Sequence, residues 1–230
     1  YSGDIMNFEM AGEMAEMDDI RTAHVVGNDD VASAPKGEEH KRRGVAGIFF
    51  IYKTAGAAAE QGASFEEVVR IAEKTKMQVR TMGVALSPCI IPEFGKASFS
   101  IGDNEMEIGM GIHGEPGIHR STLQPADLVV DQMMDKILSD LPLSPGDEVS
   151  VLVNGLGATP KEELYIVYRK IAQILKQKQV SVFHVYVGEF ATSMEMVGFS
   201  ISLCKLDAEL KNLLSIAAKT PFFEQAVLQR

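Results

Sequence analysis

The stretch Glu148-Val-Ser-Val-Leu-Val-Asn-Gly-Leu-Gly-Ala-Thr-Pro-Lys-Glu-Glu163 decides the fold class. Its first six residues are mostly apolar and predict a strand, and the glycines that follow end it. Thr159-Pro160 then favours a helix start, because threonine is a good N-cap and proline suits the first helical position. A strand that leads through a short glycine loop into a helix is the building unit of α/β proteins.

The elements that follow repeat this alternation. A long helix is predicted over Lys161–Gln177, a strand over Val180–Val187 and another strand over Gly198–Leu203. Strands that alternate with helices predict a mixed or parallel sheet with helices against it.

The glycine loop at residues 154–157 resembles a phosphate cradle, because the amides at a helix N-terminus bind anions. This loop has neither a Gly-x-Gly-x-x-Gly nor a Gly-Lys-Ser/Thr motif. We therefore expect a structural junction there, or a surface that faces a partner subunit, and not a nucleotide site.

More elements are predicted further out by apolar spacing and turn residues. A helix at residues 6–17 carries methionines on one face, which we expect to pack in the core, and Ser64 is predicted to cap a helix with Glu67 three residues on. The remaining predictions are helices at Gly44–Gly62, Phe65–Lys76, Pro125–Leu141 and Asp207–Ala218, and strands at Thr22–Val26, Gly83–Leu86, Phe99–Ile101 and Glu105–Met110.

The style of the sequence changes near residue 78, from helices to strands separated by Pro and Gly loops. We place a domain boundary there. Residues 1–78 are expected to be the C-terminal part of a first α/β domain, and residues 79–230 a second α/β domain.

The most informative loop is Gly109-Met-Gly-Ile-His113-Gly-Glu-Pro-Gly117. Four glycines and a proline in nine residues exclude a regular helix or strand interior and indicate a tight loop. An imidazole among residues without bulky side chains can meet a small molecule closely. His113 is therefore the first candidate for a binding or catalytic residue, whereas Glu115 is expected to bond loop amides and His119 to be exposed.

Several motifs, taken together in their order along the chain, resemble those of the substrate-binding K subunit of the dihydroxyacetone kinase family. They include Gly3-Asp4-Ile-Met-Asn7-Phe8, the loop Gly109–Gly117, Val153-Asn-Gly-Leu-Gly-Ala-Thr-Pro160 and Thr192-Ser-Met-Glu-Met196. The resemblance implies that a ring nitrogen of His113 adds to the substrate ketone and forms a hemiaminal. It also implies that Asp4 holds a terminal hydroxyl of the substrate and takes its proton. On its position alone, just before a helix, Asp4 is expected to be an N-cap; the resemblance reverses that preference, and both roles can hold together.

The chain departs from this family at its start. Family members carry a further N-terminal segment with a Ser-Gly-His-Glu-Pro loop and a lysine, whereas this chain opens on Tyr1. We therefore expect an N-terminally truncated fragment that holds only part of the substrate pocket.

Composition excludes several other classes of function. The formal net charge of −10 argues against nucleic acid and against an anionic membrane surface as partners. The basic cluster Lys41-Arg42-Arg43 is too short to outweigh it, and we interpret the cluster as a solvated helix start. No apolar run reaches the length of a membrane span. Cys89 and Cys204 have no metal-ligand spacing and are expected to be reduced core thiols of a cytoplasmic protein, with no metal site.

The resemblance then implies a function. The chain is expected to bind dihydroxyacetone for a phosphoenolpyruvate-dependent dihydroxyacetone kinase and to act as a homodimer. No cofactor is expected on this chain, since ADP or ATP and Mg²⁺ belong to a separate L subunit. That arrangement is favoured over a fused ATP-binding domain because only a short tail follows Phe223. Two alternatives stay open: a non-catalytic paralogue that acts as a transcription co-regulator, and a kinase subunit for a longer ketose such as erythrulose.

Overall fold

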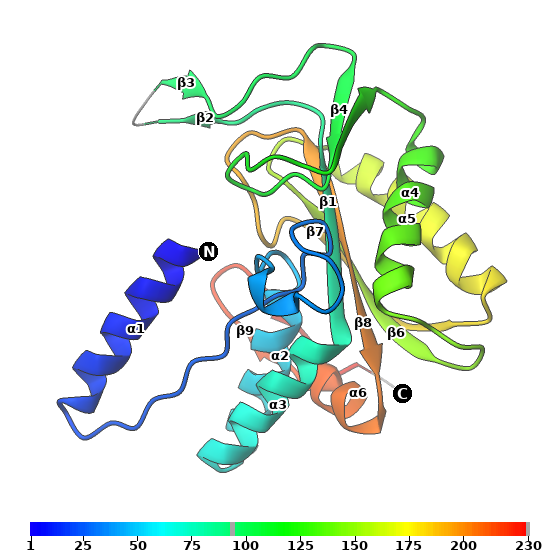
Figure 1. Cartoon of the computed structure of the whole chain (residues 1–230). Helices are drawn as coiled ribbons and strands as arrows, with labels where there is room; N and C mark the ends of the chain where they lie inside the picture. The colour runs from blue at the N-terminus through cyan, green and yellow to red at the C-terminus, as the bar shows by residue number, and fades with distance from the viewer. Residues whose placement is uncertain (93–94, 229–230) are drawn as a thin grey trace.

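The computed structural model describes residues 1–92 and 95–228. Within these ranges the centre of the molecule is a mixed sheet of six strands in the order β5-β4-β1-β8-β6-β7 (Figure 1). β6 and β7 pair in parallel, whereas the other neighbours pair antiparallel. The predicted α/β class with a mixed sheet is therefore confirmed. The strands are β1 (Val79–Ala85), β4 (Glu105–Ile108), β5 (His119–Thr122), β6 (Glu148–Gly155), β7 (Ser181–Gly188) and β8 (Gly198–Leu206).

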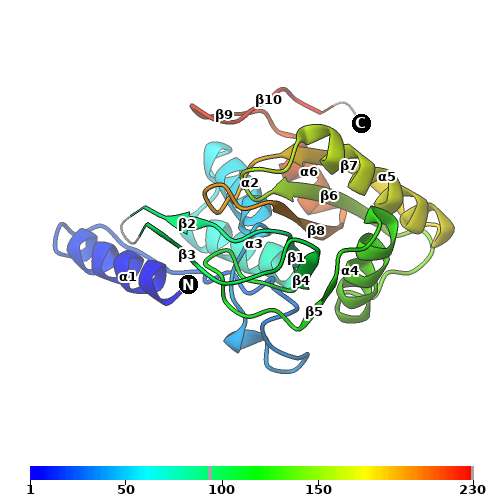
Figure 2. The ribbon, with the colours of Figure 1, turned by 90° about the horizontal axis from the view of Figure 1, so that it is seen from above.

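Helices cover both faces of this sheet (Figures 1 and 2). α4 (Ala126–Asp140) and α5 (Lys161–Gln177) share the larger core with β1, β6 and β8. The other face packs against α2 (Ile48–Glu60) and α6 (Ala208–Ser215), with α3 (Phe65–Gln78) beside α2. Because helices cover both faces, β6 and β8 are buried along nearly their whole length.

Packing crosses the boundary that we placed near residue 78. α3 ends at Gln78 and β1 begins at Val79, so the secondary structure changes there as predicted. However, Phe50 of α2 shares a core with Leu152 of β6 and Leu210 of α6. The helices before residue 78 therefore cover the sheet that the later residues build, and the division into two domains stays a prediction.

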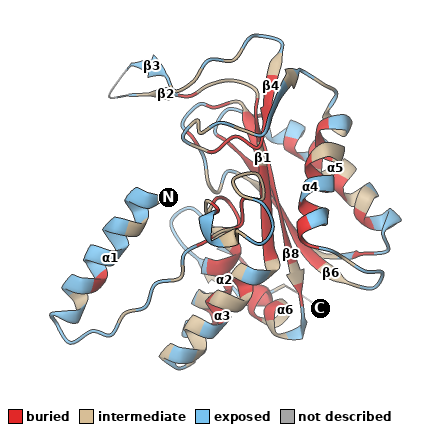
Figure 3. Cartoon of the chain, viewed as in Figure 1, coloured by how far each residue is buried: buried red, intermediate tan, exposed pale blue. Residues whose placement is uncertain are grey.

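The methionines on one face of α1 (Ser2–Glu16) were expected to pack in the core, and this prediction is wrong. Met6, Met10 and Met14 are more than half exposed, and so is Met17 beyond the helix. Figure 3 shows the helix almost entirely in the colour of exposed residues, and Gly12 is its one buried residue. Methionines spaced along one face of a helix predict that the helix is amphipathic. They do not show whether another segment packs against that face.

Of the other local predictions, one helix cap is confirmed and two strands are wrong. Ser64 caps α3 as predicted, since its hydroxyl accepts from the backbone N–H of Glu67 at 3.2 Å. Residues 22–26 and 99–101 are not strands, because no described segment pairs with them. The hairpins β2–β3 (Ile90–Ile91, Lys96–Ala97) and β9–β10 (Ala218–Lys219, Glu224–Gln225) were not predicted, nor was β5.

The basic cluster is not a solvated helix start. Lys41 ends a short 3-10 turn and is exposed, but the Arg42 side chain is fully buried and that of Arg43 is 16% exposed. Both arginines pair with buried carboxylates, Arg42 with Asp140 and Arg43 with Asp30. A charge can leave water when a carboxylate meets it with good geometry.

Among the described residues, no helix has the length and apolar character that crossing a membrane requires.

Candidate functional site

The loop that carries His113 joins β4 to β5 at the end of the sheet where β1 and β6 also finish. Its backbone needs glycine at two points: Gly109 and Gly114 have φ of +80° and +85°. A Cβ on Gly114 would also come within 3.0 Å of the Phe99 ring. The glycine-rich composition therefore does what the sequence predicted, since it lets a tight loop lie against its neighbours.

A small apolar cluster packs against the loop on its buried side. Met110 packs with Cys89, Leu156 and Met196, and Ile112 adds to the same cluster. The Ser193 hydroxyl donates a hydrogen bond to the carbonyl oxygen of Ile112, directly before His113. Cys89 and Cys204 are free and buried. The Pro- and Gly-rich stretch 87–95 passes beside this cluster, and its residues 93 and 94 lie outside the described ranges.

His113 itself faces outward, and 60% of its side chain is exposed. Glu115, in the same loop, contacts both the backbone and the ring of His113. One carboxylate oxygen, Oε2, accepts from the backbone N–H of His113 at 3.1 Å, and the other, Oε1, lies 3.5 Å from Nδ1 of the ring. The expectation that Glu115 bonds loop amides is confirmed, and the same carboxylate also faces the imidazole.

The first turn of α1 lies against the same loop. The Tyr1 ring packs edge-on against the His113 ring with centroids 4.3 Å apart, and the Tyr1 hydroxyl accepts from the backbone N–H of Ile112 at 3.1 Å. Burial, and then the negative charge of Glu115, raise the pKa of Tyr1 to about 12, so its phenol stays neutral at physiological pH.

Asp4 lies on this same first turn, and 67% of its side chain is exposed. It is not the N-cap, because the cap position is Tyr1 and no side chain caps the helix. Tyr1 therefore brings the turn that carries Asp4 to the loop that carries His113. Both of these side chains are open to a ligand.

A buried ion pair holds the other side of the loop. Arg43 donates through Nε to Oδ2 of Asp30 at 2.9 Å and through Nη2 to the carbonyl oxygen of Gly109 at 3.2 Å. Its Nη1 lies 3.9 Å from Oε2 of Glu115. Burial raises the pKa of Asp30 to about 6, although the charge of Arg43 opposes the rise. This pair is not predictable from the sequence, because a run of charged residues does not show which member turns inward.

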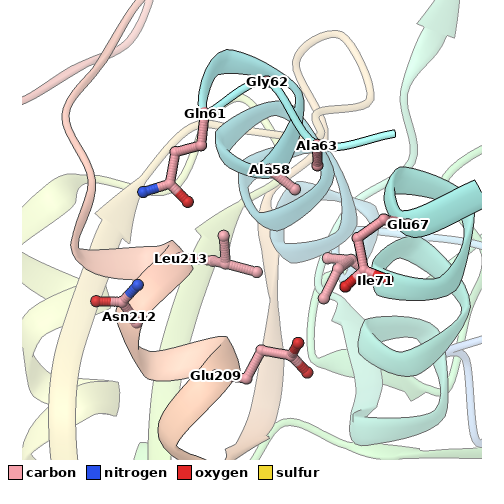
Figure 4. A pocket seen from close by; sticks show the side chains of 9 residues that line it. All are labelled: Ala58, Gln61, Gly62, Ala63, Glu67, Ile71, Glu209, Asn212 and Leu213. Atoms are coloured by element: carbon pink, nitrogen blue, oxygen red, sulfur yellow. The ribbon is translucent and has the colours of Figure 1, made fainter. Parts of the chain in front are cut away.

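Two hollows in the described part of the chain lie away from this loop. One of about 360 Å³ opens between the α2–α3 turn and α6, and its rim includes Gln61, Glu67 and Glu209 (Figure 4). Another of about 430 Å³ lies beside α4 and includes Ile118 and His119. Neither contains His113 or Asp4, and the exposed side chains of these two residues place the candidate site on the surface of this chain.

The glycine loop after β6 is a structural junction. The buried side chain of Asn154 accepts from the backbone N–H groups of Phe190 and Ala191, both at 2.8 Å, and donates to Ala191 O and Ser200 Oγ. Thr159 is not the predicted N-cap, because the cap position is Pro160. The Thr159 hydroxyl instead bonds both backbone groups of Gly198. The polar groups of Asn154 and Thr159 thus make hydrogen bonds within the protein.

No group of three His, Cys, Asp or Glu side chains among the described residues could hold a metal ion. His119 is exposed, as expected, and His40 is exposed too.

Comparison with known proteins places this geometry in a family. Residues 1–222 match the Dak1 domain. A PTS-dependent dihydroxyacetone kinase 2, dihydroxyacetone-binding subunit DhaK, from Listeria innocua is 48% identical over 97% of this chain and 67% of its own length. A D-erythrulose kinase from Mycolicibacterium smegmatis is 37% identical over the whole chain and 40% of its own length.

A solved structure also superimposes well. The dihydroxyacetone kinase operon co-activator Dha-DhaQ has a TM-score of 0.85 at 29% identity, over 94% of this chain and 67% of its own. The chain thus spans about two thirds of two of these proteins and less than half of the third. The match over nearly all its residues, together with the loop and sheet described above, shows that the chain belongs to the Dak1 domain family of dihydroxyacetone kinases.

Proposed function

We propose that this chain is the dihydroxyacetone-binding subunit of a phosphoenolpyruvate-dependent dihydroxyacetone kinase. The observation that carries the proposal is the meeting of the His113 loop with the first turn of α1, where Asp4 lies. The names of the relatives support the substrate, since the Listeria relative is called a dihydroxyacetone-binding subunit.

His113 would select the substrate by its carbonyl group. A neutral imidazole nitrogen adds to a ketone carbon and gives a hemiaminal, which an alcohol without a carbonyl cannot form. The exposed ring and the open loop leave room for a short ketose at this point. Such an adduct would hold the substrate in one place, and phosphoryl transfer depends mostly on positioning and charge stabilisation.

Asp4 would then orient the terminal hydroxyl and accept its proton during transfer. The nucleotide, ADP/ATP with Mg²⁺, would be held by a separate L subunit and would supply the phosphoryl group in its ATP form, and this chain would pair with a second copy of itself. The chain is expected to work in the cytoplasm.

The test uses dihydroxyacetone labelled with ¹³C at the carbonyl carbon, followed by NMR on the protein. The wild type should convert the ketone signal into that of a tetrahedral carbon, and His113→Ala should lose this signal while His119→Ala keeps it. With an L-type partner and its phosphate source, Asp4→Asn should keep the adduct but lower the transfer rate by roughly 10²- to 10⁴-fold.

The same experiment separates the alternatives. An adduct without phosphoryl transfer from any donor would favour the co-regulator, a function that the likeness to the operon co-activator keeps open. A higher kcat/KM for erythrulose than for dihydroxyacetone would favour the longer ketose, for which the D-erythrulose kinase relative is the precedent. If no ketone forms an adduct with the wild type, the proposal is wrong.

A further inference from the structure

Resting on the proposed function, we propose that Glu115 and Arg43 are positioning residues that hold the proton of His113 on Nδ1, so that Nε2 is the ring atom that adds to the carbonyl. The chain of contacts runs from buried Asp30 through Arg43 and Glu115 to the imidazole. It touches the ring on one side only.

Glu115 is placed to choose the ring nitrogen. Its Oε1 lies 3.5 Å from Nδ1, while its Oε2 is already held by the backbone N–H of His113 at 3.1 Å. A carboxylate is an acceptor only, so a neutral ring beside it is favoured with its proton on the facing nitrogen. Nε2 then carries the free lone pair, and it points away from the carboxylate.

Arg43 is placed to fix the carboxylate. Its guanidinium bonds Asp30 and the carbonyl oxygen of Gly109, and its third nitrogen lies 3.9 Å from Oε2 of Glu115. The Asp30 side chain is 4% exposed and that of Arg43 is 16% exposed, so water competes little for their contact. The pair ties the start of the loop at Gly109 to the carboxylate near its end.

Gly111 provides independent geometric support. A Cβ at this position would lie 2.2 Å from Oε2 of Glu115 and 2.5 Å from Nη1 of Arg43. No φ in the left-handed region requires a glycine at this position. The absence of a side chain therefore makes room for the contact between the carboxylate and the guanidinium.

The proton balance of the addition follows from this arrangement. When the Nε2 lone pair bonds the carbonyl carbon, the π pair moves to the oxygen, which takes a proton from water. The ring becomes an imidazolium that faces the Glu115 carboxylate, and this charge pair favours the adduct as it forms. Loss of the Nδ1 proton through Glu115 to the solvent then gives the neutral hemiaminal, so the proton gained by the oxygen equals the proton lost by the ring.

The first measurement is the tautomer of His113 in the protein labelled with ¹⁵N-histidine, before any ketone is added. Correlation of the ring nitrogens with the carbon-bound ring protons tells a protonated nitrogen from a free one, and the spectrum of His113→Ala assigns the signal. We expect protonated Nδ1 and free Nε2 in the wild type. Glu115→Gln, which keeps an acceptor oxygen, should retain this form, whereas Glu115→Ala should shift it toward protonated Nε2.

Gly111→Ala changes no charged group, yet it should displace Glu115 and reproduce the effect of Glu115→Ala. Asp103→Asn, an exposed carboxylate that precedes β4, is the matched control and should change nothing. Adduct formation with labelled dihydroxyacetone should slow on the order of 10- to 100-fold in Glu115→Ala and Gly111→Ala. Far-ultraviolet circular dichroism checks that both variants remain folded.

A wild-type ring protonated at Nε2, or a tautomer unchanged in both Glu115→Ala and Gly111→Ala, would overturn the inference. Protonated Nδ1 without any ketone adduct has a different meaning: the positioning of the ring stands, and the proposed function fails.

Discussion

At the scale of single residues, Ser193 tests how firmly the loop must hold His113. Its hydroxyl is buried and donates to the carbonyl oxygen of Ile112. Ser193→Ala leaves that carbonyl without its partner, and we expect a loss of about 1–3 kcal/mol in the free energy of unfolding, measured by urea denaturation. Adduct formation should weaken as well, because Ile112 precedes His113. Ser139→Ala removes an exposed hydroxyl of α4 and should leave both measurements unchanged, whereas equal losses in the two variants would contradict this role.

The same scale shows what the sequence can predict about a site. His113 and Asp4 were chosen from glycine content and from motifs, which are local signals, and their roles stay predictions. The amide-bonding role of Glu115 is confirmed. Arg43 and Asp30 could not be chosen in this way, because a short charged run normally faces water and only the fold shows which of its members meet a buried partner. Their contact depends on a segment more than sixty residues from the loop, and spacing along the chain carries no trace of it.

At the scale of elements, Thr159 joins the start of α5 to the start of β8. Its hydroxyl donates to the carbonyl oxygen of Gly198 at 2.7 Å and accepts from the N–H of the same residue at 2.8 Å. Thr159→Val keeps the shape but removes both bonds, and we expect a loss of about 1–3 kcal/mol, seen as a lower urea midpoint. Thr159→Ser keeps the hydroxyl and should lose less. Equal losses in the two variants would mean that the methyl group, and not the bonds, matters.

Elements with a strong apolar period were predictable from the sequence. The helix predicted at residues 161–177 has those bounds in α5, and β6, β7 and β8 overlap closely with the strands predicted there. The failures were segments whose structure depends on a partner. Residues 22–26 read as a strand but have no described neighbour to pair with, and β5 was missed because its residues are polar and it exists through pairing with β4.

At the scale of the whole molecule, a buried ion triad links three distant parts of the chain. Asp140 at the end of α4 accepts two hydrogen bonds from Arg42, at 2.6 and 3.0 Å, and one from Arg80 of β1. Burial by itself would raise the pKa of Asp140, but the bonds from Arg42 and Arg80 outweigh it and lower the pKa to about 2. Asp140→Asn leaves two buried guanidinium groups short of a charge partner, so we expect a loss of about 3–5 kcal/mol at neutral pH.

The sign of the pH dependence follows from the lowered pKa. The carboxyl has a pKa of about 2 in the folded chain and an ordinary value of 3.8. Its contribution, about 2 kcal/mol, is therefore fully present above roughly pH 4 and is lost as the pH falls toward 2. Urea unfolding at pH 6 and at pH 3, compared between the wild type and Asp140→Asn, isolates this contribution, because the other titrating groups are common to both proteins. The difference in unfolding free energy between the two proteins should be smaller at pH 3 than at pH 6. Protonation of Asp140 begins to remove the negative charge in the wild type, and Asp140→Asn lacks that charge at every pH. A difference that stays constant with pH would show that Asp140 acts through packing and not through its charge.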